Sequence, residues 1–392
     1  MKKNIFLFLG SVMLLALSCG KQDTVYKEFV KAGGYIYPAK PLNISAVSGY
    51  QRIFLTWEAP MDPSIRMTRL YWDNYTDSLE FAYSEYKDGV MTTVVSGLDD
   101  RSYTFDVVNF DAAGNRSLAT EITTIPFGES WLASHSERTV RFAGMSGEDA
   151  LVTMSRSTDE MVATKFRYRT VDGTWVESGY LLPGETDITL PNALKGKKFE
   201  YKSAFLPASG QDTVWAASWQ KSPDPILYPL PTSDWTVTVT ADQEYGNFTC
   251  DKIFDGIAAT NNRWHSARSG PTRVFPKILS IDTKAQEGSE YTLASFAFYQ
   301  SPSNSTYRYI RNISIYVGNT PFDPNDTDVA VNYGTPAISQ QLGRNDEVTT
   351  VSPRPLVAGR YFAIVFENSY NTSGYIDLWE LVPYGFIASE AD

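Results

Sequence analysis

The sequence predicts an all-β protein built from several sandwich domains. Aromatic residues make up 14% of the 392 residues, with 24 tyrosines and 9 tryptophans, whereas charged residues make up only 20%. Aromatic and β-branched side chains favour strands because they pack well on a pleated, half-buried surface. Apolar residues also recur in short alternating runs, such as 52–57 and 103–109, separated by turn-forming residues. This pattern is typical of antiparallel sheets with one buried face and one solvated face.

The first twenty residues predict export and a lipid anchor. Lys2 and Lys3 precede an almost wholly apolar run over 5–17, which has the length of a signal-peptide core and is too short for a membrane span. Cys19 follows this run, and the segment resembles the looser lipobox of Bacteroidetes lipoproteins. The resemblance implies cleavage before Cys19 and diacylation of that residue, which would anchor the chain stably to the outer membrane. The alternative is an ordinary secretory signal with an incidental cysteine.

Charge and cysteine content narrow the possibilities further. The formal net charge of −11 and the pI near 4.9 argue against nucleic acid as a partner and against electrostatic binding to anionic lipid. If Cys19 is lipidated, the only other cysteine, Cys250, has no partner for an intrachain disulfide. Cys250 lies in an apolar-aromatic stretch, so we expect it to be a buried small side chain. The domains must then be stable on their hydrophobic cores alone.

Residues 37–126 predict a first sandwich. Trp57 falls in the second strand-like run, the third run contains Arg-Leu-Tyr-Trp at 69–72, and Leu98 precedes Tyr103 by five residues. These features resemble the fibronectin type III fold. The Leu98–Tyr103 spacing resembles its tyrosine corner, in which the phenol bonds to a nearby backbone group.

Residues 127–222 repeat the same scheme and predict a second sandwich. Leu194 precedes Phe199 by the same five residues, but a phenylalanine cannot make the corner hydrogen bond, so this copy is degenerate. The tandem pair resembles domain-of-unknown-function modules in lipoproteins of Bacteroidetes polysaccharide-utilisation loci. Four prolines then predict a semi-rigid linker. The expected organisation is a signal peptide at 1–18, a lipidated tether at 19–36, sandwiches at 37–126 and 127–222, a Pro-rich linker at 223–233 and a third domain at 234–392.

The third domain contains five sequence elements in this order: Asp255-Gly256, Thr260, Trp264-His265-Ser266, Ile281-Asp282, and Glu380 followed by Tyr384-Gly385. In type and order they resemble the discoidin, or coagulation-factor type C, family and the related family-32 carbohydrate-binding modules. The family fold is a jelly-roll β-sandwich, which we expect here. The predicted fold class is therefore all-β, with two fibronectin III-like sandwiches followed by a discoidin-like jelly roll.

The resemblance implies two sites in the third domain. The first is a structural Ca²⁺ site, whose positions match Asp255, Thr260 and Glu380; oxygen ligands of this kind suit a hard cation. The alternative is that Asp255 simply forms a turn and Glu380 is a solvated strand residue. The second is a sugar site on loops, where hydroxyl groups take charged or amide hydrogen bonds and C–H faces pack on aromatic rings. Its candidates are His265, Arg308, Arg311, Tyr370 and Asn371, with the choice between the two arginines left open.

The sequence contains no recognisable catalytic machinery. The two histidines, His135 and His265, fall in different domains, and there is no phosphate-binding Gly-rich loop or His/Cys cluster. The adjacent acids 159–160 and 346–347 look like loop charges rather than a catalytic pair. We therefore expect a non-catalytic, cell-surface outer-membrane lipoprotein that captures glycan for a polysaccharide-utilisation system. The alternative is a structural or protein-interaction subunit of an outer-membrane transporter complex.

Overall fold

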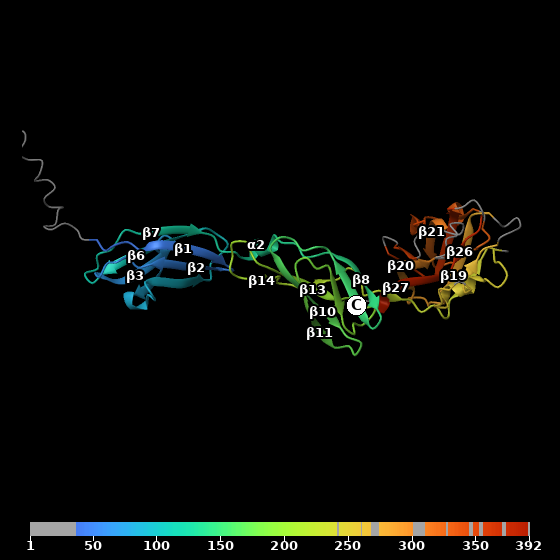
Figure 1. The fold of residues 1–392 in the computed structure, drawn as a ribbon, viewed down its shortest axis with the longest axis horizontal. Helices are drawn as coiled ribbons and strands as arrows, with labels where there is room; N and C mark the ends of the chain where they lie inside the picture. Colours follow the sequence, from blue (N-terminus) through green and yellow to red (C-terminus); the bar gives the residue numbers. More distant parts are fainter. Residues whose placement is uncertain are drawn as a thin grey trace, which may run out of the picture. The chain divides into compact units, whose positions relative to one another are not determined.

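The computed structural model confirms the all-β class (Figure 1). The structure describes residues 37–240, 243–259, 261–267, 274–300, 310–326, 328–344, 348–352, 356–370 and 374–390. The predicted signal peptide, tether and lipidated Cys19 lie outside these residues. Within them, no helix is long and apolar enough to cross a membrane. The chain divides into two compact units, one formed by residues up to 135 with 206–214 and the other by 136–205 with 215 onward.

The first unit contains a sandwich of two antiparallel sheets. One sheet has the order β1 (Leu42–Gly49), β2 (Arg52–Glu58), β5 (Val90–Ser96). The other has the order β4 (Asp77–Ala82), β3 (Ile65–Trp72), β6 (Tyr103–Asp111), β7 (Thr120–Thr124), with a short 3-10 turn, η1 (Tyr83–Glu85), after β4. Alternate residues of β2 enter the core, so Ile53, Leu55 and Trp57 are fully buried.

The predicted tyrosine corner is confirmed in this sandwich. The backbone N–H of Asp99 donates to the Tyr103 hydroxyl at 3.0 Å, and Leu98 and Tyr103 are both buried. The corner fixes the chain where it enters β6.

A directed chain of polar side chains also crosses the first sandwich. Trp57 Nε1 donates to the Tyr86 hydroxyl at 2.7 Å, which lies 2.8 Å from Thr68 Oγ1, and Thr68 Oγ1 donates to Asn109 Oδ1 at 2.7 Å. Asn109 Nδ2 then donates to the backbone oxygen of Ala39 at 2.8 Å. Because Thr68 and Asn109 have no exposed surface, each group depends on its neighbour for hydrogen bonding.

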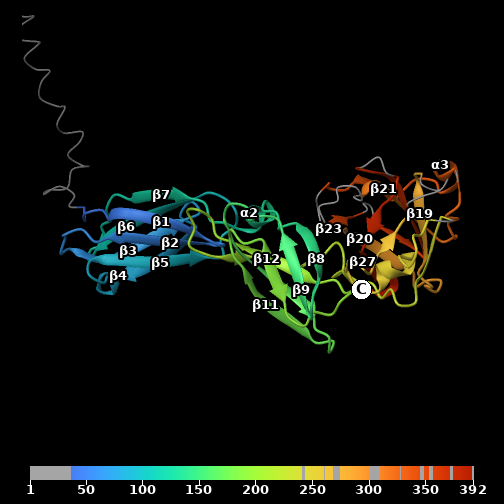
Figure 2. The ribbon, with the colours of Figure 1, turned by 45° about the vertical axis from the view of Figure 1, so that its right-hand side comes forward.

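The second sandwich follows a short helix, α2 (Glu129–Ala133), and repeats the two-sheet plan (Figure 2). One sheet has the order β12 (Asp187–Leu190), β9 (Asp149–Met154), β8 (Val140–Ser146). The other has the order β11 (Trp175–Leu181), β10 (Met161–Arg169), β13 (Glu200–Phe205), β14 (Val214–Trp215), and β15 (Gln220–Lys221) also pairs with β13. Phe199, at the degenerate corner position, is fully buried against Phe166.

The segment expected as a Pro-rich linker at 223–233 is partly built into the fold. Leu227 N donates to Ala143 O at 2.9 Å, and Met145 N donates to Leu227 O at 2.7 Å. The next two residues form β16 (Tyr228–Pro229), which pairs with β27 (Glu380–Ile387). The buried apolar residues between the prolines are Ile226, Leu227, Tyr228 and Leu230. Their burial explains why this segment packs against the domains instead of remaining a free spacer.

The third domain is a sandwich of two five-stranded sheets. One has the order β16, β27, β20 (Tyr291–Tyr299), β23 (Val348–Val351), with β24 (Val357–Gly359) also paired to β20. The other has the order β17 (Thr236–Val239), β19 (Lys277–Asp282), β25 (Tyr361–Ser369), β21 (Ile310–Gly318), β22 (Ile338–Gln341).

Short elements complete this domain. They are η2 (Cys250–Phe254), β18 (Trp264–His265), which pairs with β26 (Asp377–Leu378), α3 (Val329–Asn332) and η3 (Ala388–Glu390). Rings from the two sheets, including Phe296, Phe298, Phe362 and Phe366, fill a core with Trp264. Cys250 belongs to this core, as expected, and burial raises the pKa of its thiol to about 12.

Candidate functional site

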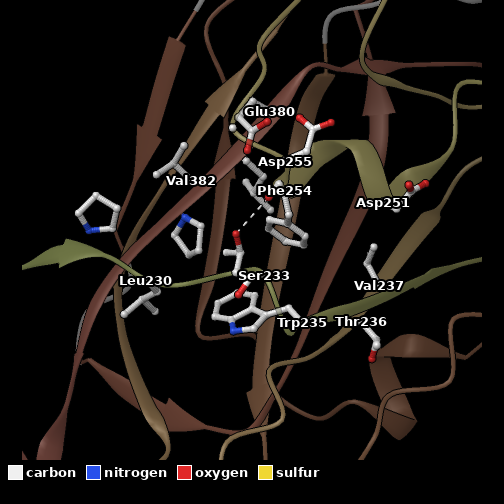
Figure 3. A pocket seen from close by; sticks show the side chains of 15 residues that line it. Leu230, Ser233, Trp235, Thr236, Val237, Asp251, Phe254, Asp255, Glu380 and Val382 are labelled. Atoms are coloured by element: carbon white, nitrogen blue, oxygen red, sulfur yellow. Dashed lines mark hydrogen bonds between the residues drawn. The ribbon is translucent and has the colours of Figure 1, made fainter.

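Two groups of side chains in the third domain correspond to the predicted sites. The first surrounds a hollow of about 780 Å³ between the segment 229–237, η2 and the start of β27 (Figure 3). Its walls mix apolar side chains, such as Trp235 and Phe254, with the carboxylates of Asp251, Asp255 and Glu380. In the close-up, the carboxylates of Asp255 and Glu380 lie next to each other at one end of the hollow.

Glu380 is the buried member of this pair. It is the first residue of β27 and only 5% exposed, which contradicts the alternative that it is a solvated strand residue. Burial, with the nearby charge of Asp255, raises the pKa of Glu380 to about 7. Backbone N–H groups of Gly256, Ile257 and Leu381 oppose this shift, but among the described residues Glu380 Oε2 has no hydrogen-bond partner.

Asp255 is held by its own loop. Its Oδ1 accepts from Ile257 N at 3.0 Å, and Asn262 Nδ2 donates to Oδ1 and Oδ2 at 2.8 and 2.7 Å. The fixed carboxylate of Asp255 therefore lies beside the buried carboxylate of Glu380, whose Oε2 accepts no hydrogen bond from the described residues. Oxygen donors in this arrangement fit a hard divalent cation, which would remove the like-charge repulsion. Thr260, the third predicted ligand, lies outside the described residues. Within those residues, no group of three His, Cys, Asp or Glu side chains could hold a metal, so further ligands would be carbonyl or hydroxyl oxygens.

The second group lies around Tyr370, directly after β25. Arg311 at the start of β21 places Cζ 5.6 Å from the Tyr370 ring centroid, and Arg344 places its Cζ at 6.0 Å. The Tyr370 hydroxyl donates to Leu342 O at 2.7 Å and accepts from Gln341 Nε2 at 3.0 Å. Both arginines and Gln341 are exposed, and Tyr370 is half-buried. An aromatic ring of fixed orientation is therefore bordered by two guanidinium groups and an amide. We call these four side chains the Tyr370 cluster.

The structure brings together only part of the predicted sugar site. Arg311 and Tyr370 are neighbours, and the choice between the two predicted arginines stays a prediction. Arg308 and Asn371 lie outside the described residues. Sequence reasoning missed Gln341 and Arg344, because it sought the basic residue only in 299–311. The polar run at 340–346 after a strand was the signal that could have identified them.

His265 is not on the surface where the prediction placed it. Its side chain has no exposed area, because the pairing of β18 with β26 sets it opposite Asp377 inside the domain. His265 Nδ1 donates to Ser266 O at 2.5 Å, Nε2 lies 3.4 Å from Asp377 Oδ1, and the ring stacks on Tyr375. This geometry makes His265 part of a buried polar cluster rather than a loop residue that could contact sugar.

Comparison with known proteins gives one family match. Residues 19–213 match DUF4998, a domain of unknown function. The match covers the tether and nearly all of the tandem sandwiches, in agreement with their expected resemblance to a domain of unknown function. No curated protein matches the chain in sequence.

Solved structures with similarity to the chain cover different parts of it. The family-32 carbohydrate-binding module of C. perfringens NanJ, in complex with galactose, is 21% identical, with 41% of this chain and 99% of that one covered and a TM-score of 0.32. The SusE-like protein BT2857 is 11% identical, with 88% of this chain and 97% of that protein covered and a TM-score of 0.34. A two-domain fibronectin type III segment of chicken tenascin is 14% identical, with 46% of this chain and 99% of that segment covered and a TM-score of 0.21.

Proposed function

We propose that the protein is a non-catalytic lipoprotein of the outer-membrane surface that binds carbohydrate through its third domain, at the Tyr370 cluster. The observation that carries this proposal is the contact of the Tyr370 ring with two exposed guanidinium groups, Arg311 and Arg344. The proposed role is glycan capture for a polysaccharide-utilisation system.

The chemistry of the cluster suits a sugar. The ring offers an apolar surface for the C–H face of a pyranose, and guanidinium and amide N–H groups can donate to its hydroxyl oxygens. The two hydrogen bonds of the Tyr370 hydroxyl, to Leu342 and from Gln341, hold the ring in place before a ligand arrives. Such preorganisation reduces the entropy lost on binding.

The lipid anchor and the metal complete the proposal. Diacylated Cys19 would hold the chain at the membrane, and the DUF4998 match begins at this residue. Ca²⁺ would be held by Asp255, Thr260 and Glu380. Its role would be structural, tying the loop after η2 to the first residue of β27. The unpartnered Oε2 of buried Glu380 supports this assignment.

A glycan array probed with the full chain tests the binding function. We expect Arg311→Ala and Tyr370→Ala each to weaken binding at least tenfold, because they remove a hydrogen-bonding cation or the stacking surface. Tyr370→Phe keeps the stacking ring but loses the two hydrogen bonds that hold it, so it should weaken binding less than Tyr370→Ala. Arg66→Ala, which removes an exposed arginine of the first sandwich, is the matched control and should leave binding unchanged.

Two outcomes would contradict the proposal. One is the absence of binding to any glycan on the array, combined with co-purification of an outer-membrane transporter; this would favour a structural or protein-interaction subunit instead. The other is glycan binding that survives both alanine substitutions in folded protein, which would place the sugar site elsewhere.

A further inference from the structure

One outer sheet face of the second sandwich carries an unusual set of exposed side chains. Along β10, alternate residues Thr164, Phe166 and Tyr168 are buried in the core. The residues between them, Lys165, Arg167 and Arg169, therefore lie on the opposite face. We call this surface the cationic-aromatic face. It consists of Lys165, Arg167, Arg169, Trp175, Glu177, Tyr180, Glu200, Lys202, Trp215 and Trp219.

Strand register explains how these residues meet. On β11, Tyr180 is opposite Lys165, Glu177 is opposite Arg167, and Trp175 is opposite Arg169. On β13, Lys202 is opposite Lys165 and Glu200 is opposite Arg167. Directly opposed side chains in an antiparallel sheet have Cβ atoms about 5 Å apart, so the face is a continuous surface across three strands.

Aromatic rings cover the cations of this face. Lys165 Nζ lies 5.1 Å from the ring centroid of Trp215 and 5.2 Å from that of Trp219. Arg167 Cζ lies 4.8 Å from the Trp219 centroid and 5.6 Å from that of Trp175. Two further cations complete the pattern: Arg169 Cζ is 5.2 Å from Trp175, and Lys202 Nζ is 5.0 Å from Trp219. These cation–π contacts hold large rings at the surface instead of in a core.

The rings remain accessible and the face is positively charged. Trp175 is 47% exposed and Tyr180 is 60% exposed. Lys165 pairs with Glu177 at 2.9 Å, and Arg167 pairs with Glu200. The four cations named above outnumber these two acids, so the face has a net charge of +2 on a chain of net charge −11. Within the described part of the chain, Arg169 and Lys202 form no ion pair.

We propose that the cationic-aromatic face binds an anionic polysaccharide, one that carries carboxylate or sulfate groups. The exposed rings supply stacking surfaces for the C–H faces of successive sugars, and Arg169 and Lys202 supply counter-charges for the anionic groups. Because the rings and the guanidinium groups lie on one sheet, both are in position before the polysaccharide binds. This site lies in a different domain from the Tyr370 cluster.

Charge argues against two other occupants. A second copy of this face would bring cations against cations, which is unfavourable for a symmetric dimer. Double-stranded nucleic acid carries a denser array of charges than a local excess of two positive charges can match. An anionic polysaccharide matches this smaller excess and offers C–H faces that can stack on the exposed rings.

Affinity gel electrophoresis of the full chain tests the proposal, with polygalacturonate, chondroitin sulfate or neutral dextran in the gel. We expect retardation by at least one of the two anionic polymers and none by dextran, and the preferred polymer distinguishes carboxylate from sulfate. Arg169→Gln and Trp175→Ala should each reduce affinity at least tenfold, and Trp175→Phe should reduce it less. Higher salt should weaken binding of the wild type more than that of Arg169→Gln.

Controls separate this site from the proposed function. Tyr370→Ala removes the ring of the other cluster and should leave retardation by the anionic polymer unchanged, as should Arg66→Gln in the first sandwich. The proposal is overturned if neither anionic polymer retards the protein, if dextran retards it equally, or if the folded Arg169 and Trp175 variants behave like wild type. Equal affinity for single-stranded DNA, or concentration-dependent dimerisation lost in Trp175→Ala, would assign the face to those occupants instead.

Discussion

Replacing Glu380 by glutamine should make the metal-free third domain more stable at alkaline pH. The folded protein raises the pKa of Glu380 from an ordinary 4.5 to about 7, mainly because burial disfavours the charged carboxylate. An acid with a raised pKa favours the folded state while it is protonated, so its contribution is greatest below pH 4.5 and is lost as the pH rises towards 7. The amide introduced by Glu380→Gln has no charge to bury and avoids this loss.

The magnitude follows from the two pKa values. Between about pH 5 and pH 8, the linkage relation gives wild type a loss of roughly 2 to 3 kcal/mol in the free energy of unfolding, and Glu380→Gln does not lose this stability. For a domain of this size, that corresponds to roughly 5 to 10 °C in the unfolding temperature. Because other groups also titrate in this range, the informative quantity is the difference between wild type and variant at each pH.

Calorimetry of the full chain in chelator measures this difference. The unfolding transition whose midpoint temperature changes in Glu380→Gln is the one that reports on the third domain. Glu287→Gln, which replaces an exposed acid of the same domain, should leave all midpoints unchanged. Adding Ca²⁺ at pH 8 should then stabilise wild type and have little effect on Glu380→Gln. A wild-type-to-variant difference that is the same at pH 5 and pH 8 would refute the assignment of a buried, destabilised carboxylate.

Two further predictions concern buried polar groups elsewhere in the chain. Thr68→Val should destabilise the first sandwich by about 1–3 kcal/mol, because it removes the acceptor of the Tyr86 hydroxyl proton and the donor to Asn109 Oδ1. Urea denaturation measures the change, and strict additivity with Tyr86→Phe would contradict a connected chain. Cys250 should react with iodoacetamide at pH 8 at least a hundredfold more slowly in folded than in urea-unfolded protein, because burial raises the pKa of its thiol to about 12. Peptide mass mapping measures the rate at this residue, and comparable rates in both states would show that the thiol is accessible.

The fold was largely predictable from sequence because its signals are local. The alternation in β2 that buries Ile53, Leu55 and Trp57 is visible in the sequence, and so is the five-residue spacing that forms the Tyr103 corner. The packing of 226–230 was not predictable in the same way. Prolines normally mark a spacer, and whether the apolar residues between them find a surface depends on distant strands such as β8 and β27.

The sites were less predictable because they depend on long-range pairing. A Trp-His-Ser sequence does not reveal that β26, more than 100 residues later, will cover His265. Similarly, Arg344 reaches Tyr370 only because β22 pairs with β21, which in turn pairs with β25. The cationic-aromatic face shows the same limitation, since its rings come from β11 and from residues 215–219, and only the sheet brings them over the cations of β10.

The central position of β27 has a consequence for synthesis of the protein. This strand lies between β16 and β20, so neither of those strands has its main partner until residues 380–387 exist. In a chain that emerges N-terminus first, at the ribosome or across a membrane, the two N-terminal sandwiches can close early, whereas the third domain must wait for its final strand. Until about 90 residues after β20 have emerged, the incomplete domain exposes unpaired strand edges. A nascent or prematurely terminated chain is therefore most vulnerable to aggregation and proteolysis in this domain.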